Sequence, residues 1–258
     1  TNSGHVRIYQ KSSSVSIAEN TTAVTTYTVT DADAGDTVSW QLSGDDADLF
    51  EINSSGELKF KNAPDYETPL GGANDDSNTY LVTITATDRA NLSDSEDLKV
   101  MIGDVNEAPV LNVSATSSVS IAENATAVAS YTVTDGDAGD TVSWSLTGDD
   151  ASLFEINSSG ELTFKSAPDY ENPLGGANDD SNAYSVTVTA TDSGGLTDST
   201  DLTVNVGDEN EAPVLNVAAT STVNIAENTT AVSTYSVTDA DAGDTVSWSL
   251  TGDDASLF

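Results

Sequence analysis

Two short stretches of the sequence crowd oxygen-bearing side chains in front of an Ala-Pro pair. They read GDVNEAPVLNV from Gly103 and GDENEAPVLNV from Gly207, so the second stretch follows the first after 104 residues. Each sets an Asp, an Asn and a Glu close together on a short segment. Carboxylate, amide and carbonyl oxygens are the ligands that Ca²⁺ takes, roughly six to eight at a time. The pattern predicts a repeated site for a divalent cation, with a merely acidic linker as the alternative.

The charge of the chain fits a cation as its partner. There are 43 acidic and seven basic residues, a formal net charge of −36 and a pI near 4.1. Nucleic acid is a poor partner, because binding phosphates needs clustered Lys and Arg, and an anionic membrane surface would repel the chain. The content of 37% hydrophobic residues, arranged periodically, predicts folded domains rather than disorder. Solubility alone is the other explanation for such acidity.

Two other kinds of stabilising site are excluded by composition. The chain has no Cys, so it forms no disulfide, and a small secreted domain without disulfides needs another staple such as a metal. The single His, His5, rules out a His-rich zinc or copper site. No apolar run approaches the ~18 residues of a membrane helix, so we expect no direct membrane insertion.

Internal repetition dominates the sequence. SIAEN at Ser16 and Ser120 returns as NIAEN at Asn224, and TVSWSLTGDDASLF, which begins at Thr141, recurs unchanged from Thr245. A period of this length suits an independent domain rather than a solenoid unit. We therefore predict the tail of a preceding, different module, two full repeats, and the N-terminal half of a third, truncated repeat, with bounds 1–13, 14–108, 109–212 and 213–258.

Within a repeat the hydrophobic pattern is that of β-strands. Val38, Trp40 and Leu42 alternate with polar residues, which is the period of a strand with one buried face. About seven short strands in a hundred residues favour an immunoglobulin-like sandwich, with one core Trp per repeat and no stable helix. The strands of the first repeat are expected at 14–18, 23–30, 37–43, 49–53, 57–61, 80–87 and 96–103.

The acids follow particular strands of this predicted sandwich. Each full repeat carries the Glu of IAEN in the first strand, DADAGD or DGDAGD after the second, PDYE after the fifth, TATD after the sixth and D-x-N-E-A-P at its close. Loops of an antiparallel sandwich gather at its two ends. The ends of the first and fifth strands and the closing linker fall at one end of a repeat, its bottom, and the loops after the second and sixth strands fall at the other end, its top. The bottom of one repeat, the linker and the top of the next repeat should therefore bring these acids close together.

This set of motifs resembles the calcium-binding pattern of cadherin repeats, and more closely that of bacterial cadherin-like repeats in large surface adhesins. The resemblance covers nearly all of residues 14–258. It implies an all-β fold of tandem seven-stranded Greek-key β-sandwiches, joined by calcium-binding linkers with two or three Ca²⁺ per junction. Glu107 stands where the family usually has Asp, and Ala108 where it has Asn, yet a Glu carboxylate and an Ala carbonyl can still reach a cation.

The resemblance also implies the ligands. At the first junction they are Glu19, Asp65, Glu67, Asp104, Val105, Asn106, Glu107, Ala108, Asp135, Asp137 and Asp192. At the second junction they are Glu123, Asp169, Glu171, Asp208, Glu209, Asn210, Glu211, Ala212, Asp239 and Asp241. The top of the first repeat, with no such linker before it, would hold only half a site, from Asp31, Asp33 and Asp88.

Other chemistry finds little support in the sequence. DADAGD begins like an EF-hand loop, but the twelfth position from Asp31 is Leu42 rather than Glu. GGANDD at Gly71 is similar to a calcium β-roll motif, but it occurs once per repeat, so a solvated acidic loop is the better interpretation. No positioned base accompanies a Ser nucleophile, so we predict no enzyme.

These observations predict a calcium-rigidified spacer array of a large extracellular or cell-surface protein, of bacterial type, that extends an adhesive tip from the cell. The receptor of such a tip would lie outside this sequence. Two alternatives stay open. The repeats could themselves mediate calcium-dependent homophilic adhesion, or the chain could be the subunit of an extracellular filament assembled by strand donation.

Overall fold

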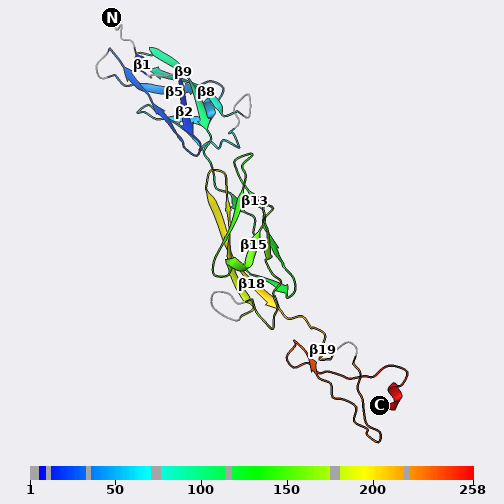
Figure 1. The fold of residues 1–258 in the computed structure, drawn as a ribbon. Helices are drawn as coiled ribbons and strands as arrows, with labels where there is room; N and C mark the ends of the chain where they lie inside the picture. Colours follow the sequence, from blue (N-terminus) through cyan, green and yellow to red (C-terminus); the bar gives the residue numbers. More distant parts are fainter. Residues whose placement is uncertain are drawn as a thin grey trace. The chain divides into compact units, whose positions relative to one another are not determined.

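The computed structural model describes residues 6–9, 13–32, 36–70, 77–113, 118–174, 181–217 and 221–258 (Figure 1). His5, Asp33 and the GGANDD loop, about which the sequence made predictions, lie outside these ranges. The chain divides into two compact units. The first comprises Thr1–Ala108 together with Asp135–Asp140, and the second comprises Pro109–Thr134 together with Thr141–Phe258.

The first repeat is a sandwich of two sheets, and the all-β prediction is confirmed. A four-stranded sheet has the order β2-β9-β8-β5, and a three-stranded sheet has the order β3-β7-β6. Strand β2 pairs in parallel with β9, whereas the other pairs in these sheets are antiparallel. The elements are β2 (Ser14–Ala18), β3 (Ala23–Thr26), β4 (Thr28–Thr30), β5 (Ser39–Ser43), the 3-10 turn η1 (Ala47–Leu49), β6 (Phe50–Ile52), β7 (Glu57–Phe60), β8 (Thr79–Thr87) and β9 (Ser93–Gly103).

A further strand, β1 (Arg7–Tyr9), precedes these and differs from what the sequence suggested. It pairs antiparallel with β4, and the N–H of Ile8 donates to Oδ2 of Asp94 at 2.9 Å. Val6 beside it is buried. The described residues of the segment that we expected to belong to another module therefore pack on the first repeat, because their alternating apolar side chains complete its core.

Strict alternation along the long strands builds the core. Tyr80, Val82, Ile84 and Ala86 of β8 are all buried, and their neighbours in the sequence face outward. The ring centroids of Phe50 and Phe60 are 4.2 Å apart, and both rings meet Tyr80 edge-on. The predicted core tryptophan, Trp40, is only partly buried and packs against the margin of this cluster.

The second repeat reproduces this architecture strand for strand. Its four-stranded sheet has the order β11-β18-β17-β14, with β11 parallel to β18, and its three-stranded sheet has the order β12-β16-β15. The elements are β10 (Val110–Leu111), β11 (Ser118–Ala122), β12 (Ala127–Ser130), β13 (Val133–Thr134), β14 (Ser143–Thr147), η2 (Ala151–Leu153), β15 (Phe154–Ile156), β16 (Glu161–Phe164), β17 (Ala183–Thr191) and β18 (Thr197–Gly207).

Residues 213–258 contain little regular structure in their described part. Two short strands pair antiparallel, β19 (Val214–Leu215) and β20 (Val237–Thr238), and η3 (Ala255–Leu257) is a single 3-10 turn. Tyr235 is 44% exposed although its counterpart Tyr131 is 6% exposed, and Phe258 is 75% exposed where Phe154 is 2% exposed. In the described part of this segment, these side chains are not enclosed as their counterparts in the second repeat are.

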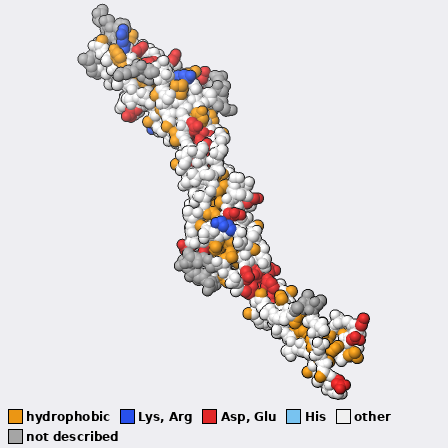
Figure 2. Space-filling view, viewed as in Figure 1, with side chains coloured by type: hydrophobic (Ala, Val, Ile, Leu, Met, Phe, Trp, Pro, Cys, Tyr) orange, Lys and Arg blue, Asp and Glu red, His pale blue; other side chains and the backbone are white. Residues whose placement is uncertain are grey.

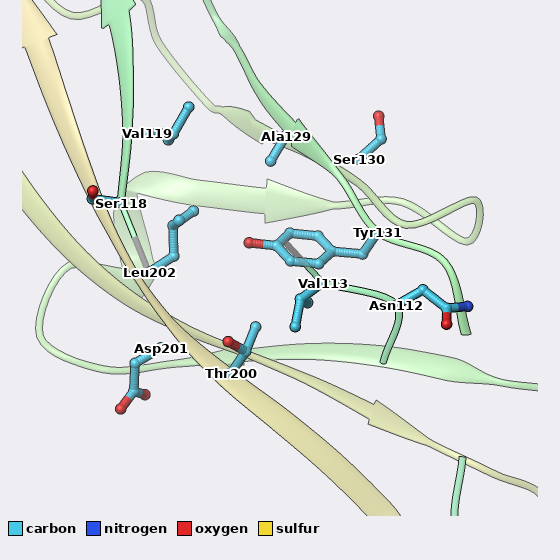
Figure 3. Close-up of a pocket in the computed structure, with 10 residues that line it drawn as sticks. All are labelled: Asn112, Val113, Ser118, Val119, Ala129, Ser130, Tyr131, Thr200, Asp201 and Leu202. Atoms are coloured by element: carbon cyan, nitrogen blue, oxygen red, sulfur yellow. The ribbon is translucent and has the colours of Figure 1, made fainter. Parts of the chain in front are cut away.

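One pocket of about 200 Å³ lies on the second repeat, between the start of β11 and the middle of β18. The ring of Tyr131 extends into it, and Asp201 is its one ionisable acid or base besides that phenol (Figure 3). Oδ1 of Asp201 accepts a hydrogen bond from the Thr187 hydroxyl at 2.6 Å. The described part of the chain has no helix with the length and apolar character of a membrane span.

Candidate metal centre

The first acid cluster is organised around Glu19, which follows directly after β2. Because β2 runs parallel to β9, Glu19 lies beside the start of the D-x-N-E-A-P segment, and its N–H donates to the carbonyl of Gly103 at 3.1 Å. The side chain is 3% exposed. Oε1 accepts the N–H of Val105 at 2.9 Å, and Oε2 accepts the N–H of Tyr66 at 2.8 Å. One buried carboxylate thus joins three segments of the chain.

Two further acids complete a group around Glu19. Glu67 comes from the PDYE segment and Asp104 from the segment after β9, and ligand oxygens of Glu19, Glu67 and Asp104 all lie within 4.8 Å of one another. No basic side chain balances them, since Lys59–Glu51 is the one ion pair among the described residues. The group therefore carries concentrated negative charge.

The DGDAGD loop brings the next carboxylates to the same place. Asp135–Asp140 belongs by its contacts to the first unit. Oδ2 of Asp137 accepts the N–H of Glu107 at 2.8 Å, and the N–H of Asp137 donates to Oδ1 of Asp135 at 3.1 Å. Carboxylate oxygens of Glu67, Glu107 and Asp137 lie within 4.8 Å of one another. So do those of Asp135, Asp137 and Asp140, and the shared residues make the groups contiguous.

The electrostatics show that these acids are poorly accommodated on their own. Burial, together with the charges of Glu19 and Asp137, raises the pKa of the Glu107 carboxyl to about 7. Burial also raises the pKa of Glu67 and of Asp104, with neighbouring carboxylates adding to both shifts. Oε2 of Glu107 and Oδ2 of Asp135 are buried and receive no hydrogen bond. Buried carboxylate oxygens without a donor are costly, and a cation would satisfy them.

The second cluster repeats the first at the closing segment of the second repeat. Glu123 accepts the N–H groups of Tyr170 at 2.7 Å and Glu209 at 2.9 Å. Its carboxylate lies within 4.8 Å of those of Glu171 and Asp208. The N–H of Glu211 donates to Oδ2 of Asp241 at 2.7 Å, as Glu107 does to Asp137.

The pKa values of acids in the second cluster are raised in the same way as those in the first. Burial is the main cause that raises the pKa of Glu171, Asp208 and Glu211, and the surrounding carboxylates add to it. Oε2 of Glu211 is buried without a hydrogen-bond donor. On the face of the molecule in Figure 2, acidic side chains gather in patches while basic ones are few.

Several predicted ligands have other interactions. Asp65 is exposed and accepts the N–H of Thr68 at 2.8 Å, and Asp169 does the same for Asn172 at 2.9 Å. The amide of Asn106 donates to the carbonyl of Glu107 at 3.1 Å, and that of Asn210 to the carbonyl of Glu211 at 3.0 Å. For Asn106 and Asn210 the ligand role stays a prediction.

Asp192 and Asp239 have structured surroundings of their own. Asp192 is buried in the second unit, where its Oδ1 accepts the N–H of Leu196 at 2.7 Å. Oδ1 of Asp239 receives the N–H of Asp241 at 3.4 Å. For the carbonyls of Val105, Ala108, Glu209 and Ala212, the ligand role stays a prediction.

Three residues that contact the acid clusters were missed by the sequence reasoning. Asp140, the third acid of DGDAGD, joins the group of Asp135 and Asp137. Asn20 has a positive φ of 58° and its amide donates to Oε1 of Glu107 at 3.3 Å, while Asn124, with φ 61°, does the same for Glu211 at 3.4 Å. Asn is among the few residues that adopt this backbone conformation readily. The repeated IAEN segment is the sequence signal from which a role for these Asn residues could have been predicted.

The donor set suits calcium. The groups offer carboxylates from separate segments, with amide and carbonyl oxygens nearby, and no nitrogen or sulfur ligand. Ca²⁺ accepts such oxygens in flexible geometry, whereas Mg²⁺ prefers a tight octahedron that retains several waters. The residues present therefore fit a calcium site.

Comparison with known proteins agrees with this fold. Human CDH23 EC21-23 is 22% identical with a TM-score of 0.54, and the match covers 89% of this chain and 78% of that chain. Protocadherin gammaB7 EC3-6, in a cis-dimer structure, is 27% identical with a TM-score of 0.50, and the match covers 94% of this chain and 62% of that chain. Mouse Cadherin-23 EC22-24 is 24% identical with a TM-score of 0.47, and the match covers 81% of this chain and 66% of that chain. The chain thus spans slightly less than two thirds of the length of the last two. No curated protein sequence matches it. Residues 117–207, within the second repeat, match the family model of the cadherin domain.

Proposed function

We propose that the chain is a spacer array of cadherin-like repeats whose boundaries are made rigid by calcium, within a large extracellular adhesin of bacterial type. Cadherin-like extracellular repeats are typical of adhesion or spacer roles, they are not enzymes, and they bind calcium at the junctions between repeats. What supports the spacer role in this chain is the arrangement of the linker Asp104–Ala108.

The observation that carries the proposal is the pair of contacts made by Glu107. Its N–H is bonded to Asp137, while Oε2 of its side chain is buried without a donor among other carboxylates. With no cation present, repulsion among these charges favours opening of the cluster. A bound Ca²⁺ converts the repulsion into attraction and fixes the linker to the loop.

We assign two or three ions to each junction, in keeping with the successive carboxylate groups. Glu19, Glu67 and Asp104 would hold one ion, Glu67, Glu107 and Asp137 the next, and Asp135, Asp137 and Asp140 a third. Asp192 is proposed as a further ligand of the third ion. The first repeat supports this, because Asp88, its counterpart there, lies within 4.8 Å of Asp31 and Asp36.

A distance measurement tests the proposal directly. The chain has no Cys, so Gln41→Cys on β5 and Ser145→Cys on β14, at equivalent exposed positions of the two repeats, would introduce the sole thiols for spin labels. We expect a narrow distribution of distances in calcium and a broad one in chelator. Adding Asp137→Asn should broaden the distribution in calcium, whereas Asp149→Asn, an exposed acid outside these groups, should not. Equal widths with and without calcium would contradict the proposal.

One observation favours a filament subunit as a second function. Apolar side chains of the third repeat that match core residues of the second are exposed, and Val232, Tyr235, Leu250 and Phe258 line a shared apolar depression. Strands of another molecule could cover this surface. Sedimentation in calcium separates the functions: an array spacer stays monomeric, a filament subunit polymerises, and homophilic repeats form small oligomers that chelator dissolves.

A further inference from the structure

The loop between β13 and β14 contains a dipeptide that occurs nowhere else in the chain. Asp135-Gly136 is the one position in the sequence at which Gly directly follows an Asp or an Asn. The first and third repeats have Ala at the equivalent place, in Asp31-Ala32 and Asp239-Ala240. A Gly after Asp leaves the backbone nitrogen without a neighbouring Cβ and gives the chain more conformational freedom there. Both properties favour attack of that nitrogen on the Asp carboxyl group.

The local geometry brings the two reacting groups together. Oδ1 of Asp135 accepts the N–H of Asp137 at 3.1 Å. This hydrogen bond spans Gly136, so it draws the Asp135 carboxyl group toward the backbone of that residue. Gly136 is exposed, and within the described part of the chain its N–H donates no hydrogen bond. The nitrogen is therefore not engaged elsewhere.

Gly136 also lies against the linker side chain on which the junction depends. A Cβ at this position would be 3.3 Å from Oε2 of Glu107 and 3.9 Å from its Cβ. With an ion bound, the Asp135 carboxylate is held as a ligand and Glu107 covers Gly136. Without the ion, repulsion among the carboxylates of this cluster favours opening of the loop, and the Asp135 carboxyl group can then rotate onto the Gly136 nitrogen.

We propose that Asp135-Gly136 is a site of spontaneous aspartate isomerisation that becomes reactive when the junction loses calcium. The Gly136 nitrogen attacks Cγ of Asp135, so that a new N–C bond forms. The N–H proton and one carboxyl oxygen leave with a second proton as water, which gives a cyclic imide. Water then opens the imide. Cleavage of its bond to the former side-chain carbonyl restores Asp, and cleavage at the α-carbonyl gives isoaspartate of unchanged mass.

Isomerisation would leave a lasting mark on the junction. In isoaspartate the main chain runs through Cβ and Cγ, so the backbone gains one methylene and the free carboxylate moves to Cα. Asp137, two residues later, would be displaced from the N–H of Glu107 that it now accepts at 2.8 Å. Calcium dependence rests on the proposed function, whereas the reactivity of the dipeptide rests on its sequence and geometry.

Prolonged warm incubation at neutral pH tests the proposal, with isoaspartate located by electron-transfer fragmentation in a mass spectrometer. We expect it to accumulate at residue 135 in chelator, and not at Asp31 or Asp239. If only the opened loop reacts and does not bind the ion, calcium at about 100 times its Kd should slow the reaction about 100-fold. Absence of isoaspartate at residue 135 in chelator would overturn the proposal. Equal rates in calcium and chelator would overturn the calcium dependence, and the spin-label distances would still decide the junction separately.

Two reciprocal variants provide matched controls. Gly136→Ala gives the second repeat the residue that the third has naturally, and should abolish the reaction. Ala240→Gly should create a second reactive site, because Oδ1 of Asp239 accepts the N–H of Asp241 in the same kind of turn, at 3.4 Å. In the spin-labelled chain, calcium added after long incubation in chelator should restore narrow distances fully in Gly136→Ala and only partly in the parent sequence. Complete recovery in both would contradict the lasting effect on the junction.

Discussion

Replacing Glu107 by Gln should have opposite effects on stability with and without calcium. Gln keeps the shape of the side chain and an oxygen for the amide of Asn20, and its new amide group can donate to nearby carboxylates. Without calcium the change removes repulsion. Charges of Glu67 and Asp137 within 4.8 Å each cost about 0.9 kcal/mol at the dielectric of water and about 3.5 kcal/mol at an effective dielectric of 20. Because Glu107 is half-buried and screened, we take about 1–2 kcal/mol in total.

For a domain of this size, that gain should raise Tm in chelator by roughly 5–10 °C. In calcium the sign reverses, because a ligand is lost. An ion held at a concentration of about 100 times its Kd contributes about 2.7 kcal/mol, so losing it should lower Tm by roughly 10–20 °C.

Differential scanning calorimetry of the first unit in the intact chain, in excess calcium and in excess chelator, measures both effects. Glu155→Gln is the control, since this exposed Glu of β15 belongs to none of the acid groups described above and should leave Tm unchanged in both conditions. A shift of the same direction in calcium and in chelator, or no shift in either, would refute the reasoning.

Three further outcomes follow from the same structure. In chelator, the urea concentration at the unfolding midpoint should fall as the pH rises from about 5 to 7.5. The pKa of Glu107 rises from 4.5 to about 7 on folding, so the folded state loses its stabilising proton across that interval. Saturating calcium should abolish this fall. Phe60→Ala removes a buried ring packed at 4.2 Å from Phe50, and should cost about 3–5 kcal/mol by urea unfolding, equally with and without calcium. Gly56→Ala should abolish folding of the first repeat, seen as lost chemical-shift dispersion, because φ is +80° and a Cβ would lie 2.3 Å from the carbonyl oxygen of Tyr27; a native spectrum would contradict this.

Much of the fold was predictable because the long strands alternate strictly. Tyr80 to Ala86 could be assigned to a half-buried strand from residue types alone. Six of the seven predicted strands of the first repeat are present, whereas the predicted strand 23–30 is divided into β3 and β4, which belong to different sheets. Strand β1 was not predicted, since three residues are too few for a pattern to register. The partial exposure of Trp40 could not be foreseen either, because a period of two gives the face of a side chain but not its distance from the edge of the sheet.

The candidate site was predictable in its acid types and less so in its details. The resemblance implied that Glu107 and Asp137 bind at one junction, but it could not show that a backbone N–H of one reaches the carboxylate of the other. Asp140 was overlooked because the resemblance suggested two acids in that loop, and the structure groups three. Asp65 shows the converse, since a local backbone hydrogen bond holds an expected ligand at the surface. Whether such a carboxylate binds a cation or accepts a backbone N–H of its own turn depends on the three-dimensional geometry, which the sequence does not give.

The parallel pairing of β2 with β9 has a consequence under tension. The register runs from Ser14 opposite Lys99 to Ala18 opposite Gly103, so force applied at the beginning of β2 and at the end of β9 slides the two strands along each other. Every hydrogen bond of that ladder is then stretched together, whereas an antiparallel hairpin would peel open one bond at a time. The second repeat has the same geometry in β11 and β18. Each repeat should therefore resist extension by shear until its ladder ruptures in one step.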